Sequence, residues 1–450
     1  MAFPNGFVWG TAASAYQIEG AAAADGKGKS VWDMFCRRKG RIWRGQTGEV
    51  ACDHYHRYAE DVALMKRIGL KAYRLSISWP RILPAGTGQV NKKALVFYDR
   101  LIDELLAAGI APWVTLFHWD YPYDLYCRGG WLNPDSPDWF ADYTRAVVDQ
   151  LSDRVSCWLT LNEPQCFIGM GHQQGTHAPG VKLDLPDVLR ASHHTLLAHG
   201  KSVQVIRARA KSAPQVGWAP VGCLSRPATT DPADIAAAER ASFAVDSDSV
   251  FNTAWWSDPV FLGEYPADGV ERYGDSMPLI APDDMETISQ PLDFYGINLY
   301  QGGSVRAGDD GEPAPVPPAV GEPITLYEWS VTPEALYWAV RFCHRRYGKP
   351  IVVTENGLSC MDWVALDGRV HDPQRIDFTQ RYLRKLARAI DDGVDVRGYF
   401  HWSILDNFEW NEGYKHRFGL VHVDFQTLKR TMKDSASWYG EVIHTNGQSL

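Results

Sequence analysis

The sequence predicts a single (β/α)8 barrel, and three observations lead to this fold class. Short apolar segments recur along the chain and are too short to be buried helices. Segments with the period of amphipathic helices separate them, such as 95–106 and 139–148. The apolar segments number eight, which is the number of strands in a parallel barrel of this kind. They are residues 7–15, 72–79, 111–118, 157–163, 215–221, 293–300, 351–355 and 396–405.

The alternation continues to the end of the chain. A further helix is predicted to begin at Thr332-Pro333, with a capping hydroxyl followed by proline at the first helical position. The stretch 301–322 is rich in Gly, Pro and Ala and resembles a linker. A cut there would leave only two of the eight strands on its carboxyl side, too few to close a barrel. We therefore interpret 301–322 as a long loop at the barrel mouth and residues 1–450 as one catalytic domain.

Charge and cysteine content exclude several classes of protein. The net charge is −9, from 54 acidic and 45 basic residues, which provides no basic surface for nucleic acid or anionic membranes. The eight cysteines include no C-x-x-C pair, so neither a zinc site nor a small disulfide scaffold is predicted, and most should be reduced core residues. Residues 1–6 show no export signal, and no apolar segment has membrane-spanning length. The expectation is a cytoplasmic protein with a small, weakly charged substrate.

Two glutamates stand at the ends of predicted strands. Residues 351–354 are apolar or β-branched and lead directly to Glu355, and residues 157–162 lead in the same way to Glu163. In a (β/α)8 barrel the active site is built from the loops that follow the strands. Cleavage of a glycosidic bond requires a pair of carboxyl groups. A lone strand-end glutamate is more often a structural ion-pair partner, but polar and aromatic residues at other strand ends favour catalysis here. They are Gln17, Glu19, His118, Trp119, Asp120, Asn162, Asn298, Tyr300 and Trp402.

Several of these motifs resemble those of glycoside hydrolase family 1, the β-glucosidases and their relatives. The motifs are residues 73–79, 117–120, 160–164, 353–357 and 406–410, and the resemblance extends from 7–12 to 433–436 in the order of the family. It implies that Glu163 is the general acid/base and Glu355 the nucleophile. The resemblance also implies a sugar pocket formed by Gln17, His118, Trp119, Asn162, Glu409 and Trp410, with Trp402 as its stacking platform. Arg74, Asn298 and Tyr300 would surround the nucleophile, and Trp329 would be a platform for the aglycone.

Each implied role has a physical reason. A retaining mechanism needs two carboxyl groups about 5–5.5 Å apart, one ionised and the other protonated. Arg74 and the Tyr300 hydroxyl would favour the charged form of Glu355, whereas Glu163 has only the neutral Asn162 beside it and a negative neighbour opposite. We therefore expect Glu163 to stay protonated. Asn162 would bind the 2-hydroxyl of the sugar, a contact that strengthens in the transition state.

Individual residues restrict the range of substrates that we expect. A carboxylate at Glu409 can accept hydrogen bonds from two adjacent sugar hydroxyls and would repel a 6-phosphate. Relatives that act on thioglucosides carry glutamine in place of the acid/base, so Glu163 argues against that branch. Three residues depart from the usual family pattern. Gln165 stands where tryptophan is usual, Tyr121 where leucine is common and Leu299 where tyrosine is common, and these departures affect the expected aglycone preference more than the expected activity.

The sequence thus predicts a retaining β-glucosidase that releases glucose from cellobiose, short cello-oligosaccharides and aryl or alkyl β-glucosides. Side activity on β-galactosides and β-fucosides and some transglycosylation are expected, with a role in cellulose degradation. No cofactor or metal is predicted, because the histidine pairs at 54 and 56 and at 193 and 194 lack spaced acidic or cysteine partners. The alternative is a catalytically silent carbohydrate-binding or sensing protein, which should have lost a glutamate or its supporting Arg or Tyr. Natural aglycone and oligomeric state are left open.

Overall fold

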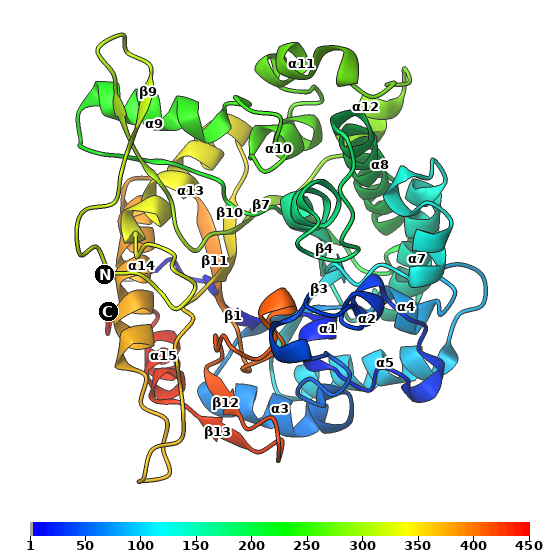
Figure 1. Cartoon of the computed structure of the whole chain (residues 1–450). Helices are drawn as coiled ribbons and strands as arrows, with labels where there is room; N and C mark the ends of the chain where they lie inside the picture. Colours follow the sequence, from blue (N-terminus) through cyan, green and yellow to red (C-terminus); the bar gives the residue numbers. More distant parts are fainter. Residues whose placement is uncertain (1–2) are drawn as a thin grey trace.

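A computed structural model describes residues 3–450 of the protein, and its centre is a closed barrel of eight parallel strands (Figure 1). Around the barrel the order is β1, β11, β10, β7, β5, β4, β3 and β2, so strands that follow one another in the chain are neighbours. The predicted (β/α)8 barrel is confirmed. Its strands are β1 (Val8–Ala12), β2 (Ala72–Ser76), β3 (Ala111–Phe117), β4 (Cys157–Asn162), β5 (Gln215–Ala219), β7 (Phe294–Asn298), β10 (Ile351–Asn356) and β11 (Val396–Trp402).

The first two strands end earlier than the apolar segments that predicted them. The segment 7–15 provides β1, and the chain then turns into the short helix α1 (Ala15–Ile18). The segment 72–79 provides β2 and the first residue of α4 (Trp79–Ile82). Ala13 and Ile77, which follow these strands, are buried, so the apolar segment continues beyond the hydrogen-bonded strand.

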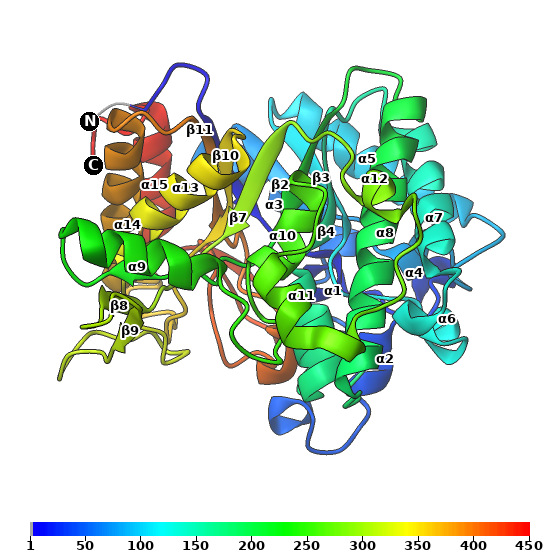
Figure 2. The same cartoon turned by 90° about the horizontal axis from the view of Figure 1, so that it is seen from above.

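Helices surround the barrel in both views (Figures 1 and 2). In α5 the buried Phe97, Leu101 and Leu105 recur every four residues, which gives the helix one apolar face. The longer helices are α3 (His54–Ile68), α5 (Lys92–Ala107), α7 (Ser136–Leu151), α8 (Leu185–Arg209), α9 (Pro232–Phe243), α13 (Pro333–Tyr347), α14 (Pro373–Asp391) and α15 (Asp434–His444). Shorter helices are α2 (Val31–Phe35), α6 (Tyr123–Cys127), α10 (Ala254–Phe261), α11 (Ala267–Tyr273) and α12 (Asp284–Ile288). Single turns are η1 (Ala24–Gly26), η2 (Trp43–Gly45), η3 (Gly130–Leu132), η5 (Gly274–Ser276) and η6 (Trp410–Glu412), and η4 (Gln165–Gln174) is a π-helix.

The predicted start of α13 is correct in position but not in every contact. Pro333 is the first residue of the helix and Thr332 precedes it. The Thr332 hydroxyl does not cap the helix and instead accepts a hydrogen bond from the backbone N–H of Gly302 (3.0 Å). It therefore ties the helix start to the segment that follows β7.

The stretch 301–322 is more ordered than a long loop. It contains β8 (Ser304–Ala307) and β9 (Pro313–Val316), an antiparallel pair that joins β6 (Arg226–Pro227) in a small sheet. A second small sheet pairs β12 (Val421–Val423) with β13 (Arg430–Met432). The stretch 301–322 is thus a connection within one barrel, as expected, but it is not irregular throughout, because β8 pairs with β9 and with β6.

Aromatic side chains fill the interior of the barrel. Trp113 packs against Phe294 and Phe400, with ring centroids 5.4 Å and 5.0 Å apart. These rings belong to a buried cluster that also contains Trp402, the last residue of β11. Among the described residues, none of the helices is both long and apolar enough to cross a bilayer.

Candidate active site at the barrel mouth

A cavity of about 780 Å³ opens at the carboxyl ends of the barrel strands. This volume is in the range of small-molecule binding sites. Nine of the predicted site residues line it: His118, Trp119, Glu163, Tyr300, Trp329, Glu355, Trp402, Glu409 and Trp410. The other four are fully buried behind this lining and bind it through hydrogen bonds: Gln17, Arg74, Asn162 and Asn298. The structure thus brings all thirteen into one region, although they come from seven of the eight barrel strands and the loops that follow them.

Glu355 is the fifth residue of β10, and two groups hold its carboxylate. The Arg74 guanidinium lies 2.6 Å from Oε1, and the Tyr300 hydroxyl donates to Oε2 over 2.7 Å. Arg74 is itself held in β2 by the Thr115 hydroxyl (3.0 Å). Both carboxylate oxygens therefore have donors, which fixes the orientation of the side chain.

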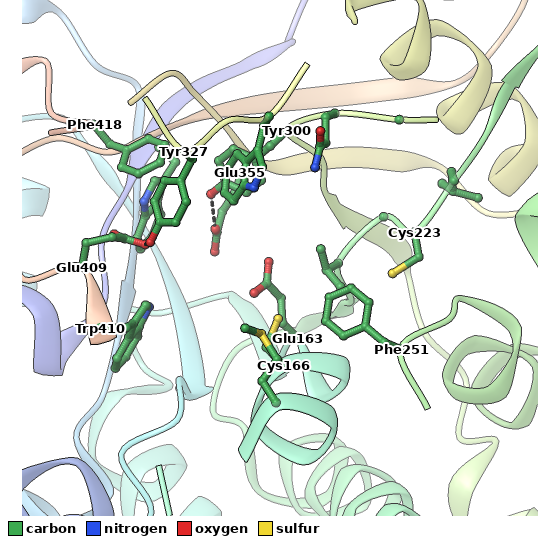
Figure 3. Close-up of a pocket in the computed structure, with 18 of the residues that line it drawn as sticks. Glu163, Cys166, Cys223, Phe251, Tyr300, Tyr327, Glu355, Glu409, Trp410 and Phe418 are labelled. Atoms are coloured by element: carbon green, nitrogen blue, oxygen red, sulfur yellow. Dashed lines mark hydrogen bonds between the residues drawn. The ribbon is translucent and has the colours of Figure 1, made fainter. Parts of the chain in front are cut away.

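Glu163 follows the last residue of β4 and has a left-handed backbone with a φ of 48°. A non-glycine residue in this conformation is strained, and such strain gathers at functional sites. The Asn298 amide donates to Glu163 Oε1 over 2.8 Å. Figure 3 shows the carboxyl groups of Glu163 and Glu355 pointing toward one another across the cavity.

Asn162 connects the surroundings of the two glutamates. Its side-chain oxygen accepts hydrogen bonds from Arg74 (2.6 Å) and Asn298 (2.9 Å), and its amide donates to His118 Nε2 (3.1 Å). Burial and the charge of Arg74 keep the pKa of His118 well below its usual value, so its ring is neutral and accepts this hydrogen bond. One amide hydrogen of Asn162 is left for a ligand.

The electrostatics of the two glutamates differ. Burial raises the pKa of Glu163 to about 8, and the charge of Glu355 contributes to this rise. Burial also raises the pKa of Glu355, but Arg74 and the hydrogen bond from Tyr300 act in the opposite direction. Arg74 and Tyr300 thus favour the ionised form of Glu355, as expected from their chemistry. The contribution of burial to Glu355 could not be derived from the sequence.

Glu409 is the third carboxyl group in the cavity. Its oxygens accept hydrogen bonds from Gln17 Nε2 (3.1 Å) and from the Tyr327 hydroxyl (3.4 Å). Burial and the charge of Glu355 raise the pKa of Glu409 to about 8. The sequence-based expectation treated Glu409 as a plain carboxylate, whereas its burial beside Glu355 favours the protonated form.

Aromatic rings form one wall around the carboxyl groups. Trp119 packs on Trp410 with ring centroids 4.4 Å apart, and the His118 ring is stacked on Trp402 at 5.7 Å. Trp119 and Trp410 also have positive φ angles, 77° and 50°. The Trp119 indole N–H donates to the backbone oxygen of Asn162 (2.9 Å). Flat apolar rings beside hydrogen-bonding groups suit the faces and edges of a sugar.

Farther from the two glutamates, the cavity is lined by residues that the sequence did not identify. Tyr327 is stacked between Trp329 (4.5 Å) and His416 (3.8 Å), and Phe418 packs near the same group. On the opposite side Cys166, Met170, Cys223 and Phe251 line the cavity. Tyr327 and Phe251 lie in irregular segments rather than directly after a strand, so no periodic pattern marks them. Within residues 3–450 no cluster of three or more His, Cys, Asp or Glu side chains has the arrangement of a metal site.

A (β/α)8 barrel that presents opposed carboxyl groups in a buried cavity lined by aromatic rings has the architecture of a glycosidase. Comparison with known proteins agrees. A sequence model of glycosyl hydrolase family 1 matches residues 1–448. The chain belongs to glycosyl hydrolase family 1, and it is a glycosidase.

Similar proteins cover the whole chain. A 1,4-β-D-glucan glucohydrolase of Thermotoga neapolitana is 45% identical over 447 residues, which are 99% of each chain. β-Glucosidase A of Acetivibrio thermocellus is 46% identical over 453 residues, again 99% of each chain. Among solved structures, a β-glucosidase from Thermotoga maritima in complex with glucoimidazole has a TM-score of 0.91 at 43% identity and covers 99% of each chain.

Proposed function

We propose that the protein is a retaining β-glucosidase. Its substrates would be cellobiose, short cello-oligosaccharides and aryl or alkyl β-glucosides, with side activity on β-galactosides and β-fucosides and some transglycosylation. The observation that carries this proposal is the pair of opposed carboxyl groups, of which Glu355 alone forms an ion pair with Arg74. The names of the similar proteins support the glucosidase assignment. No cofactor is needed for this chemistry. A cytoplasmic location stays a prediction.

In this mechanism the two glutamates have different roles. Ionised Glu355 attacks the anomeric carbon while protonated Glu163 donates its proton to the leaving oxygen. A covalent glycosyl-enzyme forms, and Glu163, now ionised, takes a proton from the water that attacks the same carbon. The amide hydrogen of Asn162 that is not bound to His118 is available to the 2-hydroxyl. Hydrogen bonds that strengthen in the transition state lower the barrier more than those made equally to the bound substrate.

Hydrolysis of p-nitrophenyl β-D-glucoside tests the proposal directly. Wild-type protein should hydrolyse it, and Glu355→Ala should lose nearly all of this activity because no nucleophile is left. Proton NMR of the first product should show β-glucose, because two inversions retain the configuration. Initial α-glucose would exclude retention. Binding of glucose measured by calorimetry, with no hydrolysis of any β-glucoside, would instead identify a carbohydrate sensor.

A further inference from the structure

Gln165 uses its side-chain amide to bind the backbone of two other segments of the chain. It is fully buried, two residues after Glu163, at the start of η4. Its amide nitrogen donates to the backbone oxygens of Val221 (3.2 Å) and Asn252 (3.3 Å). Its side-chain oxygen accepts from the backbone N–H of Val221 (3.3 Å). Both amide hydrogens and one acceptor site are therefore used, and the amide orientation is fixed by the groups that it faces.

The two segments that Gln165 joins carry part of the cavity wall. Val221 and Cys223 follow β5, and Phe251 precedes Asn252. Val221, Cys223 and Phe251 all line the cavity and are only partly buried. We refer to these three residues as the Gln165-held wall. Figure 3 shows Cys223 and Phe251 on the same side of the cavity as Glu163.

The Gln165-held wall is also tied to the environment of Glu163 from its other side. The backbone N–H of Gly222 donates to the backbone oxygen of Asn298 over 2.7 Å, and the Asn298 amide donates to Glu163 Oε1. The segment after β5 therefore lies between Asn298 and Gln165. Its position relative to the Glu163 carboxyl is set by hydrogen bonds on both sides.

This position has a chemical consequence. In the proposed mechanism Glu163 protonates the oxygen that joins the sugar to its aglycone, so the first atoms of the aglycone must lie beside Glu163. The cavity lining on this side includes the apolar side chains of Val221 and Phe251, with Met170 from η4. In the proposed function the glycone is bound instead by groups around Glu409 and Trp402. A displacement of the wall would thus change the contacts of the aglycone and leave those of the sugar unchanged.

We infer that Gln165 is a positioning residue for the aglycone: it clamps the Gln165-held wall beside Glu163 and thereby sets how strongly the enzyme distinguishes aglycones joined to the same sugar. The inference rests on the proposed β-glucosidase function. It assigns no bond between Gln165 and the substrate. Gln165 acts through the backbone of Val221 and Asn252.

The test compares substrates that share glucose and differ only in the aglycone. Gln165→Met keeps the length of the side chain but removes its amide, which frees the wall. We expect kcat/KM for octyl β-D-glucoside to fall about tenfold, because its apolar aglycone packs on the wall, and kcat/KM for cellobiose, whose aglycone is a polar sugar, to fall by less than about threefold. Inhibition by deoxynojirimycin, which carries no aglycone, should change by less than about twofold. Gln165→Glu is a second variant, which loses both donors but keeps an acceptor for Val221, and should act in the same direction.

The control is Gln150→Met, which removes an amide that binds Asp99 (2.5 Å) on the outer helices α7 and α5. It should leave the ratio of kcat/KM between octyl glucoside and cellobiose and the inhibition constant unchanged. An unchanged ratio between aglycones in both Gln165 variants would overturn the inference. Equal losses for all substrates and for inhibitor binding would do so too, because they would assign Gln165 a purely structural role. If wild-type protein hydrolysed no β-glucoside, the proposed function itself would fail, which is a separate outcome.

Discussion

The Arg74 guanidinium lies 2.6 Å from the Glu355 carboxylate, and both side chains are buried. Of the three carboxyl groups in the cavity, Glu355 alone forms an ion pair among residues 3–450. A buried carboxylate without a partner charge is strongly disfavoured, so the three acids cannot all be ionised at neutral pH. The one guanidinium therefore favours the negative charge on Glu355, the carboxyl group that attacks the sugar in the proposed mechanism.

The alkaline side of the pH profile should report Glu163. Its pKa is raised to about 8, and the mechanism needs its protonated form. Activity should therefore be present below pH 8 and be lost as the pH rises through that value. We expect kcat/KM for cellobiose to fall about tenfold for each pH unit above 8. The measurement is kcat/KM as a function of pH at constant ionic strength.

Glu163→Gln serves as the comparison for this prediction. With 2,4-dinitrophenyl β-D-glucoside, whose leaving group needs little protonation, the variant should still form the glycosyl-enzyme, and the alkaline decline of kcat/KM should disappear. Cellobiose should hardly react, because its leaving group needs the acid. An alkaline decline that persists in the variant at the same pH would assign it to another group.

The hydrogen bond from Tyr300 should affect the pKa of Glu355, the proposed nucleophile. The Tyr300 hydroxyl donates to Glu355 Oε2 over 2.7 Å and lowers the pKa of that carboxyl. Tyr300→Phe removes this stabilisation of the charged form, so the pKa of Glu355 should rise. The acid side of the kcat/KM profile should move to higher pH, and kcat/KM should fall about 10- to 100-fold. Tyr337→Phe is a matched control, because Tyr337 also donates to a carboxylate, that of Asp392, but outside the cavity (2.5 Å).

Much of this site could be predicted because the parallel strands of a barrel all end at one face, so that residues at their carboxyl ends lie near one another. Glu163 and Glu355 are separated by nearly two hundred residues, yet each follows a buried strand, and parallel strands of a barrel end at the same face. The short apolar segments therefore carried most of the information about the fold. Residues behind the cavity, such as Arg74, were accessible only through the resemblance to the family, because a buried strand residue has no pattern of its own.

Other features depend on distances that no local pattern contains. The hydrogen bonds of Gln165 join the end of β4 to two segments more than fifty residues away. Tyr327 contacts Glu409 from the long connection after β7, where no sequence pattern distinguishes it from an ordinary loop tyrosine. The raised pKa of Glu409 follows from burial and from the charge of Glu355. These are properties of packing in three dimensions, and they appear only when the chain is folded.

Glucose binding should be linked to the protonation of Glu409. A pKa of about 8 favours its protonated form at pH 7, whereas sugar hydroxyls that donate to its oxygens would favour the ionised form. Binding should release protons, and the affinity for glucose should rise about tenfold between pH 6 and pH 8. Calorimetry in buffers of different ionisation enthalpy measures the proton release. Glu409→Gln should bind more weakly and without this pH dependence, whereas Glu412→Gln, on the neighbouring turn, should behave as wild type.

A buried ionic cluster next to the sugar pocket should limit stability in acid. The carboxylate of Asp406 accepts hydrogen bonds from Lys433 (2.7 Å) and Arg417 (2.6 Å), and it is fully buried. Burial raises its pKa, but Lys433 and Arg417 more than offset this effect and leave the pKa at about 2. The next residue, Asn407, accepts a hydrogen bond from Gln17, which also binds Glu409. The cluster thus supports the loop that carries Glu409, the carboxyl group proposed to bind the sugar.

The sign of the resulting pH dependence follows from the lowered pKa. The ordinary pKa of an aspartate is 3.8, so the contribution of Asp406 to the free energy of unfolding is fully present above that pH. It should be lost as the pH falls from about 4 to about 2, a decrease of about 2 kcal/mol. Urea unfolding between pH 2 and pH 6 measures this decrease.

Asp406→Asn should lower the free energy of unfolding by about 3–5 kcal/mol at pH 7, because Lys433 and Arg417 lose their shared partner. The dependence of the unfolding free energy on pH between 2 and 4 should also become weaker. Asp377→Asn, which breaks an exposed ion pair with Arg381, should change the unfolding free energy by less than about 1 kcal/mol. An Asp406→Asn protein as stable as wild type at pH 7 would show that the cluster does not stabilise the fold.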